Sequence, residues 1–207
     1  MVLGRRVVME SSFRKNLPWV TIALIAANGI LFLAAECTGS TLDTDVLIRW
    51  GGAYTAYITE GQYWRLFTAM FMHSGIRHLL NNMVMLYVLG SNLEALLGRV
   101  RYILLYIIGG LIGNYVSYYL EMKAGEDIVS VGASGAIFAV MGGVLWIVIR
   151  NHGRVRNLNL SQMLLMLGFS LYFGFVATNV ANSAHVAGLI SGFLLSVLLY
   201  RKPPETA

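Results

Sequence analysis

Residues 132–150 read GASGAIFAVMGGVLWIVIR, an apolar run with a hydroxyl at Ser134 and a charge at Arg150. Residues 184–201 read AHVAGLISGFLLSVLLYR, with an imidazole at His185 and a final arginine. Each polar side chain precedes its arginine by 16 positions, about 24 Å on a helix that rises ~1.5 Å per residue. If both runs are membrane helices of the same direction, the hydroxyl and the imidazole lie at one depth. Polar groups at such a depth are usually functional.

The composition is that of an integral membrane protein. Hydrophobic residues make up 57% of the 207 positions and charged residues only 12%, whereas soluble domains carry about 25% charged residues. The mean hydropathy is +0.66. Apolar runs near the ~20 residues that span a bilayer cover residues 18–35, 78–97, 102–120, 134–149, 162–178 and 184–200. We therefore predict an all-α membrane protein, a bundle of six transmembrane helices with both ends on one side.

The positions of lysine and arginine predict the orientation of the bundle. Eleven of the fifteen lie on one side, at Arg5, Arg6, Arg14, Lys15, Arg99, Arg101, Arg150, Arg154, Arg156, Arg201 and Lys202. By the positive-inside rule, this side and both termini are cytoplasmic. We predict cytoplasmic segments at 1–17 and 201–207 around a membrane domain at 18–200. The net charge of +5 then reflects an inner face that meets anionic lipid rather than nucleic acid.

A second polar pair is predicted to join the first. With this orientation, the second, fourth and sixth helices all run from outside to inside. Asn82 precedes Arg99 by 17 positions, so it lies at about the depth of Ser134 and His185. His78 lies one helical turn above Asn82 on the same face. Four polar side chains are therefore expected to converge toward the outer leaflet.

The fourth helix is predicted to be short and closely packed. Only 16 positions separate Ser134 from Arg150, so its start is expected to lie below the outer surface. The preceding residues, GEDIVSVGASG, suit backbone that enters a membrane where protein or water covers it. Small residues every four positions predict close packing between the fourth and sixth helices. They are Gly135, Ala139 and Gly143 on one helix, and Ala184, Gly188 and Gly192 on the other.

Ser134 and His185 together indicate a nucleophile and its base. A serine is a weak nucleophile until a neighbouring base takes its proton, so this pair is the minimal apparatus of acyl transfer. His78, Asn82 and the backbone N–H of Ser134 could donate hydrogen bonds to the oxyanion of the tetrahedral intermediate. No Asp or Glu lies at this depth to complete a triad. The competing interpretation is that the serine and the histidine only pack helices.

The ordered set of motifs resembles the rhomboid intramembrane serine proteases. The matching segments are HSGIRHLLNNM with His78 and Asn82 as H-x-x-x-N, GASG around Ser134, and AHVAG around His185. Looser matches are Trp64-Arg65 and the G-x-x-x-E-x-x-x-G of Gly90, Glu94 and Gly98. The matches extend from about residue 60 to residue 200. Each motif alone is weak, but the ordered set is specific.

The resemblance implies a role for each matching residue. Within a six-helix bundle, Ser134 would be the nucleophile and His185 the general base. His78 and Asn82 would line the oxyanion site, and Phe138 would pack on the base imidazole. Packing against lipid or core is the alternative for Phe138. We expect neither the soluble domain nor the seventh helix that some members carry.

We therefore predict an endopeptidase of the cell membrane that cleaves other transmembrane proteins near the outer leaflet, without a cofactor. Its active site is predicted to face the extracytoplasmic side. A substrate helix must unwind to expose its hydrogen-bonded carbonyl, which favours substrates with small residues there. One alternative is a non-catalytic rhomboid-like protein that binds membrane helices. A transporter is disfavoured, because we see neither a charged midplane nor a clear internal repeat.

Two further polar residues receive structural interpretations. Glu94, near the inner boundary, is predicted to tie helix ends together by hydrogen bonds. His73 precedes His78 by five positions, a poor spacing for two metal ligands on one helical face. No cysteine or carboxylate cluster accompanies these histidines, so we predict no metal site.

Overall fold

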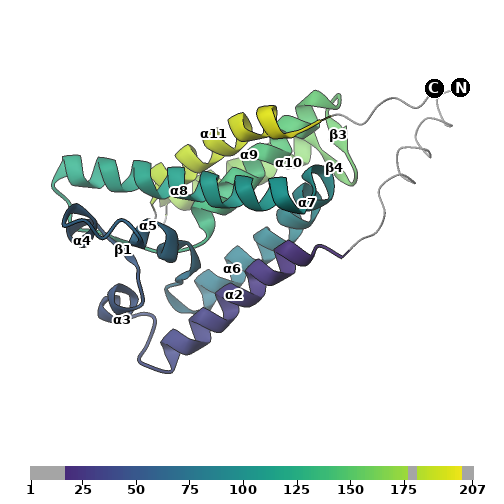
Figure 1. Cartoon of the computed structure of the whole chain (residues 1–207). Helices are drawn as coiled ribbons and strands as arrows, with labels where there is room; N and C mark the ends of the chain where they lie inside the picture. The colour runs from purple at the N-terminus through teal and green to yellow at the C-terminus, as the bar shows by residue number, and fades with distance from the viewer. Residues whose placement is uncertain (1–16, 177–180, 202–207) are drawn as a thin grey trace, which may run out of the picture.

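The computed structural model describes residues 17–176 and 181–201, and helices dominate them (Figure 1). The long helices are α2 (Trp19–Glu36), α8 (Arg99–Ala124), α9 (Ser134–Arg150), α10 (Leu160–Val176) and α11 (Asn182–Leu199). A further stretch runs without a break through α6 (Gly75–Met85), the π-helical turn η2 (Leu86–Gly90) and α7 (Ser91–Leu97). Each predicted apolar run coincides with one of these stretches to within a few residues.

The helices differ in their capacity to cross a membrane. α2, α8 and α11 are long and apolar enough to do so, whereas α9 and α10 are apolar but shorter. α9 has 17 residues, which confirms that the fourth helix is short. α8 has 26 residues and exceeds its predicted range at both ends. Gly98 (φ +79°) and Gly125 (φ +71°) bound it in backbone conformations that favour glycine.

α9 forms the centre of the bundle. It contacts α8, α10, α11, α7 and η2, and Figure 1 shows it among these helices. Twelve of its 17 residues are buried. A helix that is apolar on every side is expected in such a position. The first residue of this helix, Ser134, is therefore attached to the most enclosed element of the described structure.

Small residues bring α9 and α11 into backbone contact, as their spacing predicts. A Cβ added at Gly188 would overlap the carbonyl oxygen of Gly135, and one added at Gly192 would overlap that of Ala139. Gly142 lies equally close to the carbonyl oxygen of Leu189, a contact that the four-residue spacing did not include. The absence of side chains at these glycines lets the two backbones pack directly against each other. A larger side chain at any of them would push the helices apart.

The connections at the two ends of the bundle are unlike (Figure 1). One end carries a short hairpin of β3 (Arg154–Val155) and β4 (Leu158–Asn159). The other end carries the long loop after α2, which contains α3 (Thr44–Arg49), β1 (Ala53–Tyr54), α4 (Thr55–Thr59), α5 (Arg65–Thr68) and the 3-10 turn η1 (Ala69–Phe71). β1 pairs antiparallel with β2 (Val129–Ser130), with Ala53 opposite Ser130. The loop thereby holds the segment that leads into α9.

Arg65 organises this loop. Its Nη1 donates hydrogen bonds to the carbonyl oxygens of Ile48 at 2.7 Å and Gly52 at 3.0 Å. Its guanidinium also lies over the rings of Trp64 at 4.6 Å and Tyr57 at 5.0 Å. A planar guanidinium suits this combination of hydrogen bonding and stacking. The Trp64-Arg65 motif therefore has a structural explanation in the loop.

Glu94 ties helix ends together, as predicted. Its carboxylate is buried and accepts hydrogen bonds from the backbone N–H groups of Val20 at 3.1 Å and Thr21 at 2.9 Å. The Thr21 hydroxyl adds a third at 2.8 Å. The two N–H groups lie in the first turn of α2 and have no acceptor within that helix, and a negative charge is stabilising there. One turn earlier, Gly90 leaves room for the Tyr102 hydroxyl, which a Cβ would approach to 2.5 Å.

Candidate active site

Ser134 and His185 lie within hydrogen-bonding distance of each other. Ser134 is the first residue of α9, and His185 lies in the first turn of α11. The distance from His185 Nε2 to Ser134 Oγ is 2.8 Å. The imidazole is buried and the serine is half-buried. The glycine contacts between α9 and α11 explain how side chains 51 positions apart come so close.

The ring of Phe138 lies flat against the imidazole of His185. The two ring centroids are 4.3 Å apart and the planes differ by 12°. Phe138 follows Ser134 by one helical turn, so both face α11. Among the described residues, none forms a hydrogen bond with His185 Nδ1. The orientation of the imidazole therefore comes from stacking and from the serine rather than from a carboxylate.

The backbone at Gly132 makes room for the other predicted pair. A Cβ at Gly132 would come within 2.8 Å of His78 Cε1 and 3.6 Å of Asn82 Nδ2. Gly132 also has φ +125°, which side chains disfavour. Its N–H donates to the carbonyl oxygen of Ala69 at 2.9 Å, so protein covers this segment as it approaches the helix. His78 and Asn82 thus lie beside the backbone two residues before Ser134.

The Rhomboid domain family model matches residues 60–202 of this chain. The chain belongs to the rhomboid family. It is 31% identical to the rhomboid protease GluP of Bacillus subtilis (strain 168) over 187 residues, which are 90% of this chain and 36% of GluP. It is 32% identical to YdcA of the same strain over 194 residues, 92% of this chain and 93% of YdcA. RHOMBOID-like protein 5 of Arabidopsis thaliana is 36% identical over 159 residues, 76% of this chain and 50% of that protein.

These similarities confirm the family that the ordered motifs indicate. The rhomboid chain spans about a third of GluP, about half of the plant protein and almost all of YdcA. Family membership, apolar helices and a relative named as a protease support a membrane-embedded protease at the level of the family.

In this rhomboid, the start of α9 has backbone N–H groups that suit a negative charge. The first N–H groups of a helix have no partner within the helix, and the helix dipole favours an anion beside them. Ser134 occupies this position. The side-chain amide of Asn82 is buried, and no described residue accepts a hydrogen bond from its Nδ2. Both groups can therefore donate a hydrogen bond to an acceptor from outside the chain.

His73 is a part of the site that the sequence motifs did not assign. It is 1% exposed, and its Nε2 accepts a hydrogen bond from the N–H of Ala133 at 3.4 Å. Its ring meets that of His78 edge to face, with centroids 5.1 Å apart. The helical spacing argument does not apply to this pair, since His73 precedes α6. Among the described residues, no three metal-ligating side chains are grouped suitably for an ion.

Glu121 connects four segments around the site. Its carboxylate accepts hydrogen bonds from Ser117 at 2.8 Å, Ser130 at 3.3 Å and Thr55 at 3.0 Å. Ser117 in turn lies 2.9 Å from the hydroxyl of Ser183. Ser130 precedes the nucleophile candidate by four residues, and Ser183 precedes the imidazole by two. This network joins the segment that leads into α9 with the first turn of α11.

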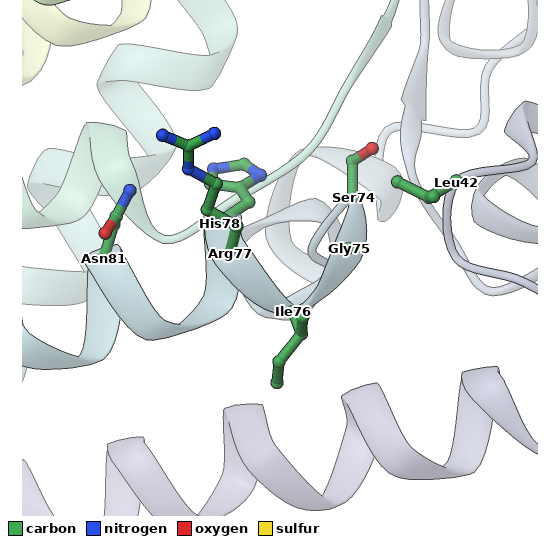
Figure 2. Close-up of a pocket in the computed structure, with 7 residues that line it drawn as sticks. All are labelled: Leu42, Ser74, Gly75, Ile76, Arg77, His78 and Asn81. Atoms are coloured by element: carbon green, nitrogen blue, oxygen red, sulfur yellow. The ribbon is translucent and has the colours of Figure 1, made fainter.

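An open hollow adjoins the site at the start of α6. Its volume is about 520 Å³, and Figure 2 shows the residues that line it. They are Leu42, Ser74, Gly75, Ile76, Arg77, His78 and Asn81. His78 lies both in this lining and beside Gly132. His78 therefore links the hollow to the backbone segment that leads into α9.

Proposed function

We propose that this rhomboid is an intramembrane serine endopeptidase that cleaves transmembrane protein substrates near the outer leaflet. The observation that carries the proposal is the 2.8 Å contact between Ser134 Oγ and His185 Nε2. A hydroxyl and an imidazole in contact between two membrane helices form a nucleophile with its base. Packing alone does not require this pair, because the α9–α11 contact is already made by glycines.

In the first chemical step, Ser134 Oγ attacks the carbonyl carbon of the scissile bond while His185 Nε2 takes the hydroxyl proton. The oxyanion that forms accepts hydrogen bonds from Asn82 Nδ2, the backbone N–H of Ser134 and His78. Each such donor is worth about 10²–10³ in kcat in acyl-transfer enzymes. The imidazolium then returns its proton to the leaving amine, and the C–N bond breaks to leave an acyl-serine.

In the second step, water attacks the acyl-serine and His185 takes a proton from it. The intermediate collapses, the new carboxyl product leaves, and Ser134 Oγ regains its proton from the imidazolium. Side chains and backbone supply every group that these two reaction steps need, so no cofactor or metal is required. Phe138 holds the plane of the imidazole through both proton transfers by stacking at 4.3 Å.

We further propose the membrane topology that the charges predict. Six transmembrane helices form a membrane domain at 18–200, with cytoplasmic segments at 1–17 and 201–207. Residues 1–16 and 202–207 lie outside the described residues. The loop containing α3, α4 and α5 then faces the extracytoplasmic side of a cell membrane, and Ser134 lies on that side. The arginine-bearing β3–β4 hairpin at the other end supports this orientation.

The substrate class follows from the same geometry. Ser134 and His185 lie at the starts of two apolar helices, which supports another membrane protein as the substrate. A peptide carbonyl inside a helix is already hydrogen-bonded, and the substrate must unwind locally before it can be attacked. Helix-breaking or small residues at the cleavage position should lower the cost of unwinding. Nucleic acid has no part in this function.

The test is cleavage of a single-pass membrane substrate by the detergent-purified protein, read on a gel. Ser134→Ala and His185→Ala should each abolish cleavage and labelling by a fluorophosphonate probe while the protein stays folded. Ser196→Ala is the matched control, since its hydroxyl bonds the carbonyl oxygen of Gly143 at 3.1 Å, deep in α11. It should cleave normally. Cleavage by Ser134→Ala would contradict the proposal, and a wild type that neither cleaves nor labels would favour a non-catalytic helix-binding protein.

A further inference from the structure

One face of α6 carries more polar side chains than the proposed chemistry uses. Arg77 and Asn81 lie one turn apart, as do His78 and Asn82, so the four form a continuous polar strip along the helix. The proposed oxyanion site takes only the second pair. Ile76 points away from this strip in Figure 2 and is 55% exposed. The strip therefore belongs to a polar surface beside the site, distinct from the lipid-facing side of the helix.

Arg77 and Asn81 have no partner within the part of the chain that the structure describes. Both side chains are exposed, and neither forms a hydrogen bond or an ion pair with a described residue. Arg65 in the long loop differs from Arg77, because it is buried and bonded to two carbonyl groups. Arg77 directly precedes the predicted membrane span at 78–97, so its guanidinium lies at the boundary of that span and is available to an anionic partner.

The hollow gives these two side chains a place to meet a ligand. Arg77, His78 and Asn81 rise from α6 on the same side in Figure 2. They line the hollow of about 520 Å³, a size within the common range for bound ligands of about 300–1,000 Å³. Because His78 also adjoins Gly132, the hollow lies next to the backbone two residues before the candidate nucleophile.

We propose that this hollow binds the unwound substrate segment next to the scissile bond, and that Arg77 selects an Asp or Glu side chain in that segment. This inference rests on the proposed protease function. Unwinding leaves backbone N–H and C=O groups that need new partners in the membrane, and the amide of Asn81 can both donate and accept. The guanidinium fork of Arg77 matches a carboxylate with two parallel hydrogen bonds.

The first experiment scans charge through the substrate. Aspartate is placed in turn at each of the three positions on either side of the scissile bond, and asparagine at the same position provides the isosteric comparison. At one position, aspartate should raise kcat/KM over asparagine by about five- to tenfold, since charge-assisted hydrogen bonds exceed exposed ion pairs in strength. No preference for aspartate at any of the six positions would overturn the proposal.

Charge reversal in the enzyme sharpens this test. Arg77→Gln should remove the preference, and Arg77→Glu should reverse it so that a lysine substrate is cleaved faster than the aspartate substrate. Arg49→Gln is the control, because Arg49 is an exposed outer arginine on α3, outside the hollow. It should keep the preference. A preference for aspartate that survives Arg77→Glu would assign the recognition to another residue.

A lipid phosphate could pair with Arg77 as a carboxylate does, so a separate experiment must distinguish the two anions. The substrate pair is compared in phospholipid-free detergent and in phosphatidylglycerol vesicles. The proposal expects the aspartate preference in both. An effect of Arg77→Gln that appears only in vesicles, equally for aspartate and asparagine substrates, would overturn it in favour of lipid binding. Fluorophosphonate labelling of Ser134 in every variant separates these outcomes from failure of the protease proposal.

Discussion

The start of α9 and the start of α6 both present polar side chains, but they hold them differently. Around α9, Ser134 and His185 are bonded to each other, and Phe138 covers the imidazole. Along α6, Arg77 and Asn81 are exposed and have no described partner. Chemistry requires groups fixed before the substrate arrives, whereas recognition leaves groups for the substrate to pair.

Backbone packing accounts for this difference. α9 contacts α11 through glycines, and each glycine lies against a backbone carbonyl group of the facing helix. The start of α6 has no such glycine contact with a facing helix, and an open hollow lies there. Changes in the first region should therefore act on kcat, and changes in the second on the choice of substrate.

The largest effect is expected from the donor that both regions share. Asn82→Ala removes a buried amide whose Nδ2 has no described partner, and we expect kcat to fall about 10²–10³-fold with little change in KM. Steady-state cleavage of a membrane substrate measures the two constants. A rise in KM with kcat unchanged would show that Asn82 serves recognition, as proposed for its neighbours on α6, and would remove it from the oxyanion site.

The next largest effect should come from the helix seam. In Gly188→Ala, the added methyl group meets the carbonyl oxygen of Gly135, and backbone atoms cannot rotate away from it. Displacement of His185 from Ser134 by about 1 Å would lower kcat on the order of 10²-fold. The same steric overlap should lower the Tm of the protein. Cleavage rates and thermal unfolding in detergent test both parts.

The matched control for the seam is Gly29→Ala on α2. A Cβ at Gly29 has nothing within 4 Å, so this change should keep activity and gain up to about 1 kcal/mol from helix propensity. Equal effects of the two substitutions would mean that the close contact does not hold the site together.

The sequence was sufficient for the features that obey short-range rules. Small residues every four positions predicted the α9–α11 contact, because a helix repeats its face every turn. Counting from Ser134 and His185 to the next arginine placed both groups at one depth, and the structure brings them together at 2.8 Å. The predicted helices also lie where the structure has them, because their apolar runs are long and uninterrupted.

Features that depend on several distant segments could not be predicted. Glu121 gathers Ser117, Ser130 and Thr55 from three elements, and nothing in its local sequence marks it. The β1–β2 pair has two residues in each strand, too few to show an alternating pattern. His73 lies before its helix, so a rule for helical faces could not place it beside His78.

A smaller effect is expected from the Glu121 network, which steadies the segments that precede Ser134 and His185. Glu121→Ala should lower kcat by about tenfold, because it frees these two segments together without touching the substrate. Glu121→Gln keeps an acceptor oxygen and should recover most of this loss. The exposed Glu60 in the long loop after α2 is the control, and Glu60→Ala should behave as wild type. If Gln were no better than Ala, the network would not act through these hydrogen bonds.

The smallest effect should come from Phe138, and it tests how rigid the first region is. Stacked aromatic pairs are worth about 0.5–1.5 kcal/mol beyond their buried area, so Phe138→Leu should lower kcat by about two- to tenfold. KM should not change, because the ring contacts the imidazole at 4.3 Å rather than the proposed substrate surface. Phe138→Tyr keeps a ring and should recover the rate. Without a carboxylate on Nδ1 among the described residues, an unchanged rate in Phe138→Leu would mean that the bond to Ser134 alone orients the imidazole. The region would then be less fixed than its contacts indicate.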